Sequence, residues 1–155
     1  MRRVRGGGGF CYNSSLMRVR KAGGADISRI VELARSLDLD YPGMPEDQLW
    51  AAEDENDGRL VGIVALKKHA DCLELCALGV APSERRKGIA KGLVEAVMAE
   101  APGPVHVATI LPGFFEALGF ERTADTPRTF VEKRKTDWCD GCERRLCTVL
   151  LRKVS

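Results

Sequence analysis

The fold is decided by the stretch Leu78-Gly-Val-Ala-Pro-Ser-Glu-Arg-Arg-Lys-Gly-Ile-Ala-Lys-Gly-Leu-Val94, in which an apolar strand leads through a basic loop directly into a helix. The first amides of a helix have no intrahelical acceptors and lie at the positive end of its dipole, so they bind phosphate groups well. Arg85, Arg86 and Lys87 add positive charge beside them. The stretch therefore predicts an anion site.

Two common glycine-rich phosphate loops do not fit this stretch. A Walker loop requires Lys-Ser or Lys-Thr after its last glycine, whereas Gly88 is followed by Ile89 and Ala90. A dinucleotide-binding Rossmann turn requires three glycines, and this turn contains one. Both classes are excluded.

The pattern Arg85-x-x-Gly88-x-Ala90 resembles the Arg/Gln-x-x-Gly-x-Gly/Ala signature of the GNAT superfamily of acyl-CoA N-acetyltransferases. The segments Pro104-Val-His-Val-Ala-Thr-Ile110 and Phe114-Phe-Glu-Ala-Leu-Gly-Phe120 follow at the distances that this family shows. The resemblance covers about residues 17–120 and implies an acyltransferase.

Composition bounds the remaining classes. With 155 residues, 45% hydrophobic and 30% charged, the chain suits one globular domain. A net charge of +2 gives no support for a nucleic-acid or membrane partner. No apolar stretch approaches the roughly 20 residues of a membrane span, and no signal peptide is recognised. We therefore expect a cytoplasmic protein whose six cysteines are reduced or bind metal.

The first sixteen residues differ from the rest, because their arginines and glycines show no periodicity. We expect residues 1–16 to be a disordered tail and residues 17–155 to form a single GNAT-like domain. Met17 is a candidate for the native start, and RNA contact by the tail is the less favoured alternative.

Periodicity predicts a mixed α/β fold of the α+β kind. Strands are expected at 17–22, 49–52, 60–66 and 72–80 as an antiparallel meander, with a helix capped by Asp26 after the first. A helix from 89 to before Pro102 then leads to a strand at 105–110, parallel to 72–80. Short helices at 113–118 and 126–135 follow, and a strand at 148–152 is expected to close a mostly antiparallel sheet flanked by helices.

The resemblance implies acetyl-CoA as the acetyl donor. Its pyrophosphate would be held by the main-chain amides of Arg86, Lys87, Gly88, Ile89 and Ala90, with Arg85 adding charge. Its pantetheine arm would pair with Leu78, Gly79 and Val80, where the family's sheet is splayed, and Gly79 suits a bulge there. Phe115 is a further candidate contact, with core packing as its alternative. The alternative to a pyrophosphate site is that this loop is only a solvated basic turn at the start of a helix.

Glu74 is the candidate general base. Strand alternation places it on one face with Cys72, Cys76 and Leu78, and apolar neighbours would raise its pKa. Superfamily members often carry an acid at this position. The alternative is a glutamate that faces water at a strand edge, and the backbone amide near Leu78 is the natural donor to the developing oxyanion.

The group that protonates the CoA thiolate is not evident. Many relatives carry Phe-Tyr in the short helix, and the tyrosine supplies this proton, whereas this chain has Phe114-Phe115. Water, Thr109 or a cysteine would have to substitute. A covalent route through Cys76 is conceivable, but a cysteine without a partner base is usually inert, so direct attack is favoured.

The cysteines near the C-terminus are candidate metal ligands. Cys139, Cys142 and Cys147 could hold a structural zinc, with a fourth ligand from Cys11, Cys72, His69, Asp140 or water. Reduced thiols without metal and a disulfide between Cys139 and Cys142 stay open as alternatives.

Three segments resemble the short, stand-alone N-acetylglutamate synthases of the superfamily: Leu39-Asp-Tyr-Pro-Gly-Met44, Cys72-Leu-Glu-Leu75 and the cysteine triplet after Trp138. The resemblance implies a small-molecule amine as acceptor, glutamate first, with its carboxylates bound by residues among Arg128, Lys133, Arg144 and Arg145. A protein acetyltransferase and a CoA-binding metal or redox sensor are the alternatives. The sequence leaves the oligomeric state open, a homodimer included.

Overall fold

A computed structural model describes residues 17–85, 88–133, 135 and 147–154. Their seven strands are hydrogen-bonded in the order β1-β2-β3-β4-β5-β7-β6, which confirms the predicted mixed, mostly antiparallel sheet. The described residues divide into two compact units. The first unit comprises those of Met1–Ala65 with Ala77–Val97, and the second those of Leu66–Cys76 with Met98–Ser155. Strands β3 and β4 pass through both units.

The first unit begins with the predicted antiparallel meander. Strand β1 (Met17–Lys21) pairs antiparallel with β2 (Gln48–Asp54), and β3 (Leu60–Lys68) and β4 (Leu73–Val80) follow as neighbours. Between β1 and β2 lie two 3-10 turns, η3 (Gly24–Asp26) and η4 (Met44–Glu46), and the helix α1 (Ile27–Ser36). The turn η5 (Pro82–Glu84) leads from β4 toward α2 (Ile89–Glu100).

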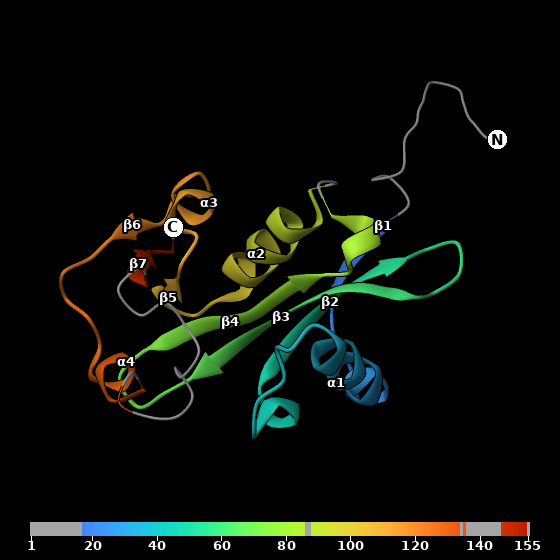
Figure 1. Cartoon of the computed structure of the whole chain (residues 1–155), viewed down its shortest axis with the longest axis horizontal. Coiled ribbons are helices and arrows are strands. Elements are labelled where there is room, and N and C mark those ends of the chain that lie inside the picture. The colour runs from blue at the N-terminus through green and yellow to red at the C-terminus, as the bar shows by residue number, and fades with distance from the viewer. Residues whose placement is uncertain (1–16, 86–87, 134, 136–146, 155) are drawn as a thin grey trace. The chain divides into compact units, whose positions relative to one another are not determined.

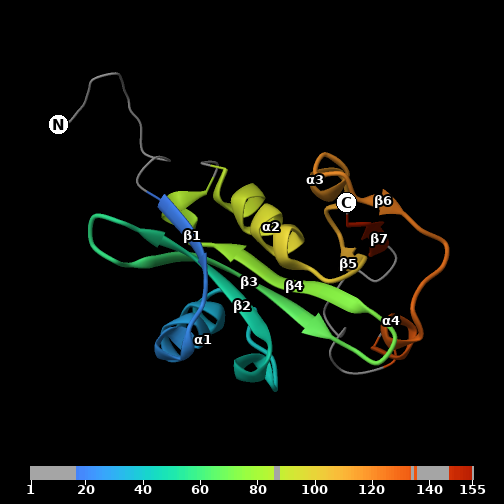
Figure 2. The ribbon, with the colours of Figure 1, turned by 180° about the vertical axis from the view of Figure 1, so that it is seen from behind.

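Both helices of the first unit cover its strands. In two opposite views α1 and α2 lie on opposite faces of β2 and β3 (Figures 1 and 2). Continuous runs of buried residues in β2 and β3 fill this core on both faces, together with the apolar faces of the helices that periodicity predicts; its buried members include Ile30, Ala34, Trp50, Ala52, Val61, Ile63, Val64, Leu93, Val94 and Val97. The space between α2 and β3 is tight, because a Cβ on Gly62 would lie 3.1 Å from Ile89 and Leu93.

The second unit contains the parallel pair. Strand β5 (Val105–Thr109) runs parallel to β4, as predicted, through the partners Leu73 with Val105 and Glu74 with His106. The helices α3 (Pro112–Glu116) and α4 (Arg128–Lys133) are shorter than the sequence indicated. Figure 1 shows α4 beside the turn between β3 and β4.

Two details of the predicted elements are wrong. Strand β7 (Thr148–Arg152) does not close the sheet but lies between β5 and the two-residue strand β6 (Glu121–Arg122), which no pattern predicted. Asp26 stands at the start of α1 without a capping hydrogen bond to that helix, because its carboxylate instead accepts the N–H of Gly23 at 2.8 Å and pairs with Arg20. No helix of the described residues is long and apolar enough to cross a membrane.

Candidate functional site

Gly88 opens the helix α2 in a conformation that favours glycine. Its φ of 77° lies in the left-handed region, and its carbonyl accepts the N–H of Gly92 at 3.1 Å, which begins the helix. A Cβ at Gly88 would meet no atom within 4 Å. The backbone therefore turns into α2 beside open space, as an anion site at a helix start requires. Arg86 and Lys87 lie outside the described residues.

The loop before α2 is anchored by its own side chains. Arg85 Nε donates to the carbonyl of Val80 at 3.0 Å, which ties the loop to the end of β4. Glu84, 8% exposed, pairs with Arg59 at 3.1 Å. The side chain of Ile89 is buried, so only its main-chain amide is left for a ligand, and Ala90 is half-buried.

The residue of β4 with a positive φ is Ala77, not Gly79. Ala77 has a φ of 54°, a left-handed conformation that interrupts the pleat of the strand. Gly79 has no positive φ, and a Cβ there would crowd Leu39 Cδ1 and lie 3.0 Å from Leu37 Cδ1. The bulge at Gly79 stays a prediction, and the two leucines after α1 are a second reason for a glycine at this position.

Glu74 lies at the start of β4 and is 3% exposed. Its Oε1 lies 2.8 Å from His69 Nε2, and its Oε2 accepts a hydrogen bond from Lys133 Nζ at 2.9 Å. The expectation of a carboxylate among apolar neighbours is therefore wrong, and so is the alternative of a glutamate that faces water. Glu74 is buried and paired with a cation and an imidazole (hereafter the Glu74 cluster: Glu74, His69 and Lys133).

Helix α4 supplies one member of the Glu74 cluster and is held by two further contacts. The Asp71 carboxylate accepts the N–H of Thr129 at 3.1 Å and the Thr129 hydroxyl, and these bonds hold the pKa of Asp71 below its usual range. The Phe130 ring lies edge-on to His106, with ring centroids 5.9 Å apart. The position of Lys133 against Glu74 is thus fixed at several points along the helix.

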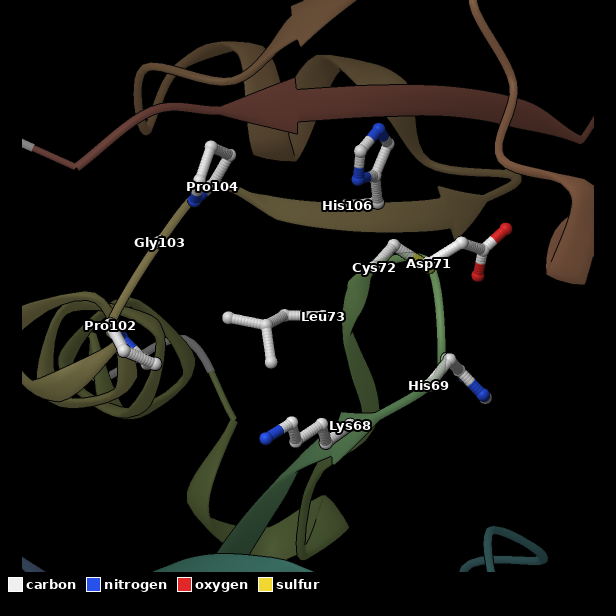
Figure 3. Close-up of a pocket in the computed structure, with 9 residues that line it drawn as sticks. All are labelled: Lys68, His69, Asp71, Cys72, Leu73, Pro102, Gly103, Pro104 and His106. Atoms are coloured by element: carbon white, nitrogen blue, oxygen red, sulfur yellow. The ribbon is translucent and has the colours of Figure 1, made fainter.

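A pocket of about 400 Å³ lies within the second unit and is shown in Figure 3. Its lining residues come from the end of β3, the turn that follows, the start of β4, the segment before β5, and β5 itself: Lys68, His69, Asp71, Cys72, Leu73, Pro102, Gly103, Pro104 and His106. Burial lowers the pKa of His106, and its Nδ1 is buried without a hydrogen-bond partner among the described residues. Burial, reinforced by Asp71, raises the pKa of the Cys72 thiol to about 12, so this thiol is protonated at neutral pH.

The other proposed catalytic and binding side chains have structural partners. Thr109 lies at the end of β5, and its hydroxyl accepts the N–H of Leu111 at 2.9 Å. Phe115 is buried, and its ring packs edge-on against Phe114 and Phe120. Core packing thus accounts for Phe115, and its contact with a cofactor stays a prediction.

The predicted zinc ligands Cys139 and Cys142 lie outside the described residues. Cys147 is half-buried just before β7, and Cys72 and Cys76 are half-buried thiols. Within 17–85, 88–133, 135 and 147–154, no group of three or more potential ligands could hold a metal ion. A zinc site stays a prediction.

The comparison with protein families decides the assignment. The model described as "Acetyltransferase (GNAT) family" matches residues 25–120, which contain both the loop before α2 and Glu74. The chain belongs to the GNAT acetyltransferase family. This confirms the family that the signature at Arg85, Gly88 and Ala90 indicated. A search of curated proteins gave no match.

Solved structures share the GNAT fold at low identity. N-acetylglutamate synthase from Neisseria gonorrhoeae, complexed with coenzyme A and N-acetyl-glutamate, aligns at 22% identity with a TM-score of 0.71 over 90% of this chain. Rv2747 from Mycobacterium tuberculosis, in complex with CoA and NLQ, aligns at 21% identity (TM-score 0.65; 89% of this chain and 99% of that one). A GNAT acetyltransferase from Staphylococcus aureus aligns at 16% identity (TM-score 0.64; 90% and 99%). This GNAT chain covers 35% of the gonococcal synthase chain.

Sequence reasoning located Glu74 and the glycine loop but missed the partners of Glu74. His69 is five residues away, in a turn, and Lys133 is 59 residues away on another element. No spacing rule connects a strand glutamate with a lysine at that separation. The only available signal was the number of histidines, since the chain has two.

Proposed function

We propose that this protein transfers the acetyl group of acetyl-CoA to the amine of a small molecule, an amino acid with glutamate as the first candidate, by direct attack. One observation carries the proposal. A left-handed Gly88 with open space around it begins a twelve-residue helix, directly after a loop anchored by Arg85 and in a chain of the GNAT family.

The pyrophosphate of acetyl-CoA is assigned to the main-chain amides from Arg86 to Ala90, with Arg85 and Lys87 adding positive charge. The geometry at Gly88 supports this assignment, because no described atom beyond its two chain neighbours lies within 4 Å of a Cβ position there. The pantetheine arm is assigned to the backbone of Leu78, Gly79 and Val80. The left-handed Ala77 supports it, since an interrupted pleat leaves backbone groups of a strand for other partners.

Acetyl transfer to an amine has three chemical requirements, and we assign each of them to a different group of the protein. The amine must lose a proton, the thioester carbonyl must be polarised, and the departing thiolate must gain a proton. The main-chain amide near Leu78 is assigned to the carbonyl. Deprotonation of the amine is assigned to the Glu74 cluster, and Thr109 or water to the thiolate.

Glutamate is the first acceptor to test because of the segments that resemble stand-alone N-acetylglutamate synthases, and the fold shared with the gonococcal enzyme agrees with this choice. Lys133, one of the predicted partners for the acceptor's carboxylates, is already paired with Glu74. Among the described residues this leaves Arg128, exposed at the start of α4, as the predicted partner.

The nucleotide site is tested by calorimetric titration of Gly88→Asp with CoA. The added carboxylate would lie where the pyrophosphate binds, and we expect affinity to fall by about 100-fold or more through lost charged hydrogen bonds. Gly58→Asp is the matched control, because Gly58 also has a positive φ, 73°, and no atom within 4 Å of its Cβ position. Equal affinity in Gly88→Asp and Gly58→Asp would reject the site.

The acceptor is tested by a screen of free amino acids and polyamines, read by the release of CoA thiol. Turnover that depends on one amine, glutamate first, is the expected result. Binding of CoA without turnover of any amine would reject the transferase proposal and favour a CoA-binding sensor.

A further inference from the structure

The Glu74 carboxylate is poorly placed to take a proton from an acceptor amine itself. Its side chain is 4% exposed, and each of its oxygens already has a partner, His69 Nε2 at 2.8 Å and Lys133 Nζ at 2.9 Å. A general base must lie within hydrogen-bond reach of the proton that it abstracts, directly or through one water. Glu74 would have to break one of its two pairs to do so.

The pair with Glu74 determines the tautomer of His69. A carboxylate accepts hydrogen bonds, so the His69 nitrogen that faces it, Nε2, carries the proton in the neutral ring. The lone pair of the neutral imidazole then lies on Nδ1. This nitrogen has no hydrogen bond with a described residue, the His69 side chain is 16% exposed, and His69 is one of the residues that line the pocket.

On this basis we propose that His69 Nδ1 is the atom that accepts the proton of the acceptor amine, and that Glu74 and Lys133 are positioning residues. This rests on the proposed acetyl transfer and deepens it. Glu74 orients the ring and stabilises the imidazolium that forms, while Lys133 holds the Glu74 carboxylate in place. The role of general base, which the sequence suggested for Glu74, is thereby assigned to His69.

The proton transfer balances. The ammonium of the acceptor gives one proton to Nδ1, and the neutral amine attacks the thioester carbonyl. The new C–N bond forms as the C–S bond breaks, and the thiolate takes the second proton that the nitrogen loses. His69 then returns its proton to water, so the net products are the amide, CoA thiol and one proton.

Charges from every neighbouring element bear on this imidazole. Besides Glu74, the titratable groups on the elements packed together here are Lys68 from β3, Asp71 and Cys72 from the following turn, His106 from β5 and Lys133 from α4. The Cys72 thiol is neutral, the pKa of His106 is lowered, and Asp71 is occupied by Thr129. Glu74 is therefore the group in direct contact with the ring of His69.

The tautomer is tested by nitrogen NMR of the imidazole rings in the whole protein. The two histidines give two sets of signals, and His106→Gln assigns them. We expect His69 to be protonated at Nε2 when neutral, and we expect Glu74→Gln to shift its Nε2 signal. An Nδ1-protonated His69 in the unaltered protein would overturn the proposal, with no need for turnover or for a stable variant.

The proton transfer is tested by the pH dependence of kcat/KM in His69→Gln. We expect a loss of about 100-fold near pH 7, because general bases contribute at least that much, and a loss that vanishes near pH 10 where the amine is already neutral. His106→Gln, which removes the other imidazole, is expected to keep the shape of the unaltered profile. A His69→Gln profile parallel to the unaltered one would overturn the proposal and return the base to Glu74.

The two failures are distinguishable. If no amine is acetylated, the proposed function is wrong and the role of His69 falls with it. If an amine is acetylated while neutral His69 carries its proton on Nδ1, acetyl transfer stands and only the role of His69 is wrong.

Discussion

Two charged clusters of the molecule are built in opposite ways. In the first unit, one cation lies between two carboxylates: Arg20 bonds Asp26 through both guanidinium nitrogens at 2.8 and 2.9 Å and Glu53 at 2.8 Å. In the second unit, one carboxylate lies between two nitrogen groups, Lys133 and the imidazole of His69. Each cluster has three members, but the central Glu74 is more deeply buried than the central Arg20, and the clusters differ in what they can do.

The difference lies in which members can change charge near neutral pH. The carboxylates of the Arg20 cluster (Arg20, Asp26 and Glu53) raise the pKa of the guanidinium still further, and the guanidinium lowers the pKa values of both carboxyl groups. All three members are therefore charged at neutral pH. The Glu74 cluster contains an imidazole, which in its neutral form offers both an N–H and a lone pair, and His69 is one of the residues that line the pocket. The first cluster can only stabilise, whereas the second can also move a proton.

The largest effect on stability is expected for Lys133→Met. It leaves the buried Glu74 carboxylate with the imidazole alone, and we expect the free energy of unfolding to fall by about 2–3 kcal/mol, less than for a fully buried pair because Lys133 is 32% exposed. Urea unfolding measures the change. Lys135→Met is the matched control, because Lys135 pairs with the exposed Glu132 at 3.4 Å and such pairs contribute about 0–1 kcal/mol.

The control and a double variant decide whether the effect comes from charge. Lys133→Met combined with Glu74→Leu replaces the pair with apolar groups and is expected to recover most of the stability. If the double variant is as unstable as Lys133→Met, the loss arises from packing of α4, and the comparison between the two clusters fails.

The limits of sequence reasoning follow the distance along the chain over which residues make contact. Residues that follow a local pattern were predicted well: the helix α2, its buried stripe, the parallel strand β5 and the turn glycine Gly88. These depend on periods of two or 3.6 residues and on neighbours along the chain. Gly79 was also identified as special, but the sequence did not indicate the two leucines that crowd it, because they come from the segment after α1.

The partners of Glu74 were beyond prediction for the same reason. Strand alternation indicates which residues share a face, but it does not indicate what covers that face. The covering helix α4 is six residues long, and its contacts with Asp71, Glu74 and His106 join residues separated by 24 to 59 positions. Tertiary packing of this range leaves no periodic signal.

Arg20→Met tests the same comparison in the Arg20 cluster, and we expect it to lower the free energy of unfolding by less than Lys133→Met does. Removal of the guanidinium leaves two carboxylates close together without their cation, and we expect a loss of about 1–2 kcal/mol at neutral pH, since the cluster is only partly buried. Because this cluster has no proposed part in chemistry, kcat/KM is expected to keep its pH profile. A changed profile would mean that the first cluster also takes part in proton transfer.

The smallest effect on stability is expected for Asp26→Asn, and it should depend on pH. The Asp26 carboxyl is ionised in the folded state to a lower pH than in the unfolded chain, because Arg20 and the N–H of Gly23 bond its charged form. Its contribution to stability is thus complete above the unfolded pKa of about 3.9 and is lost as pH falls toward the lowered folded pKa. The gap in unfolding free energy between the unaltered protein and Asp26→Asn should therefore be constant from pH 5 to 7 and should narrow below pH 4. Asp57→Asn, which alters an exposed carboxylate 3.9 Å from Arg59, is the matched control for the loss of a surface charge. If the difference in unfolding free energy did not depend on pH, Asp26 would stabilise through shape and hydrogen bonding alone. The contrast between a cluster with fixed charges and one that exchanges protons would then rest on Glu74 and His69 only.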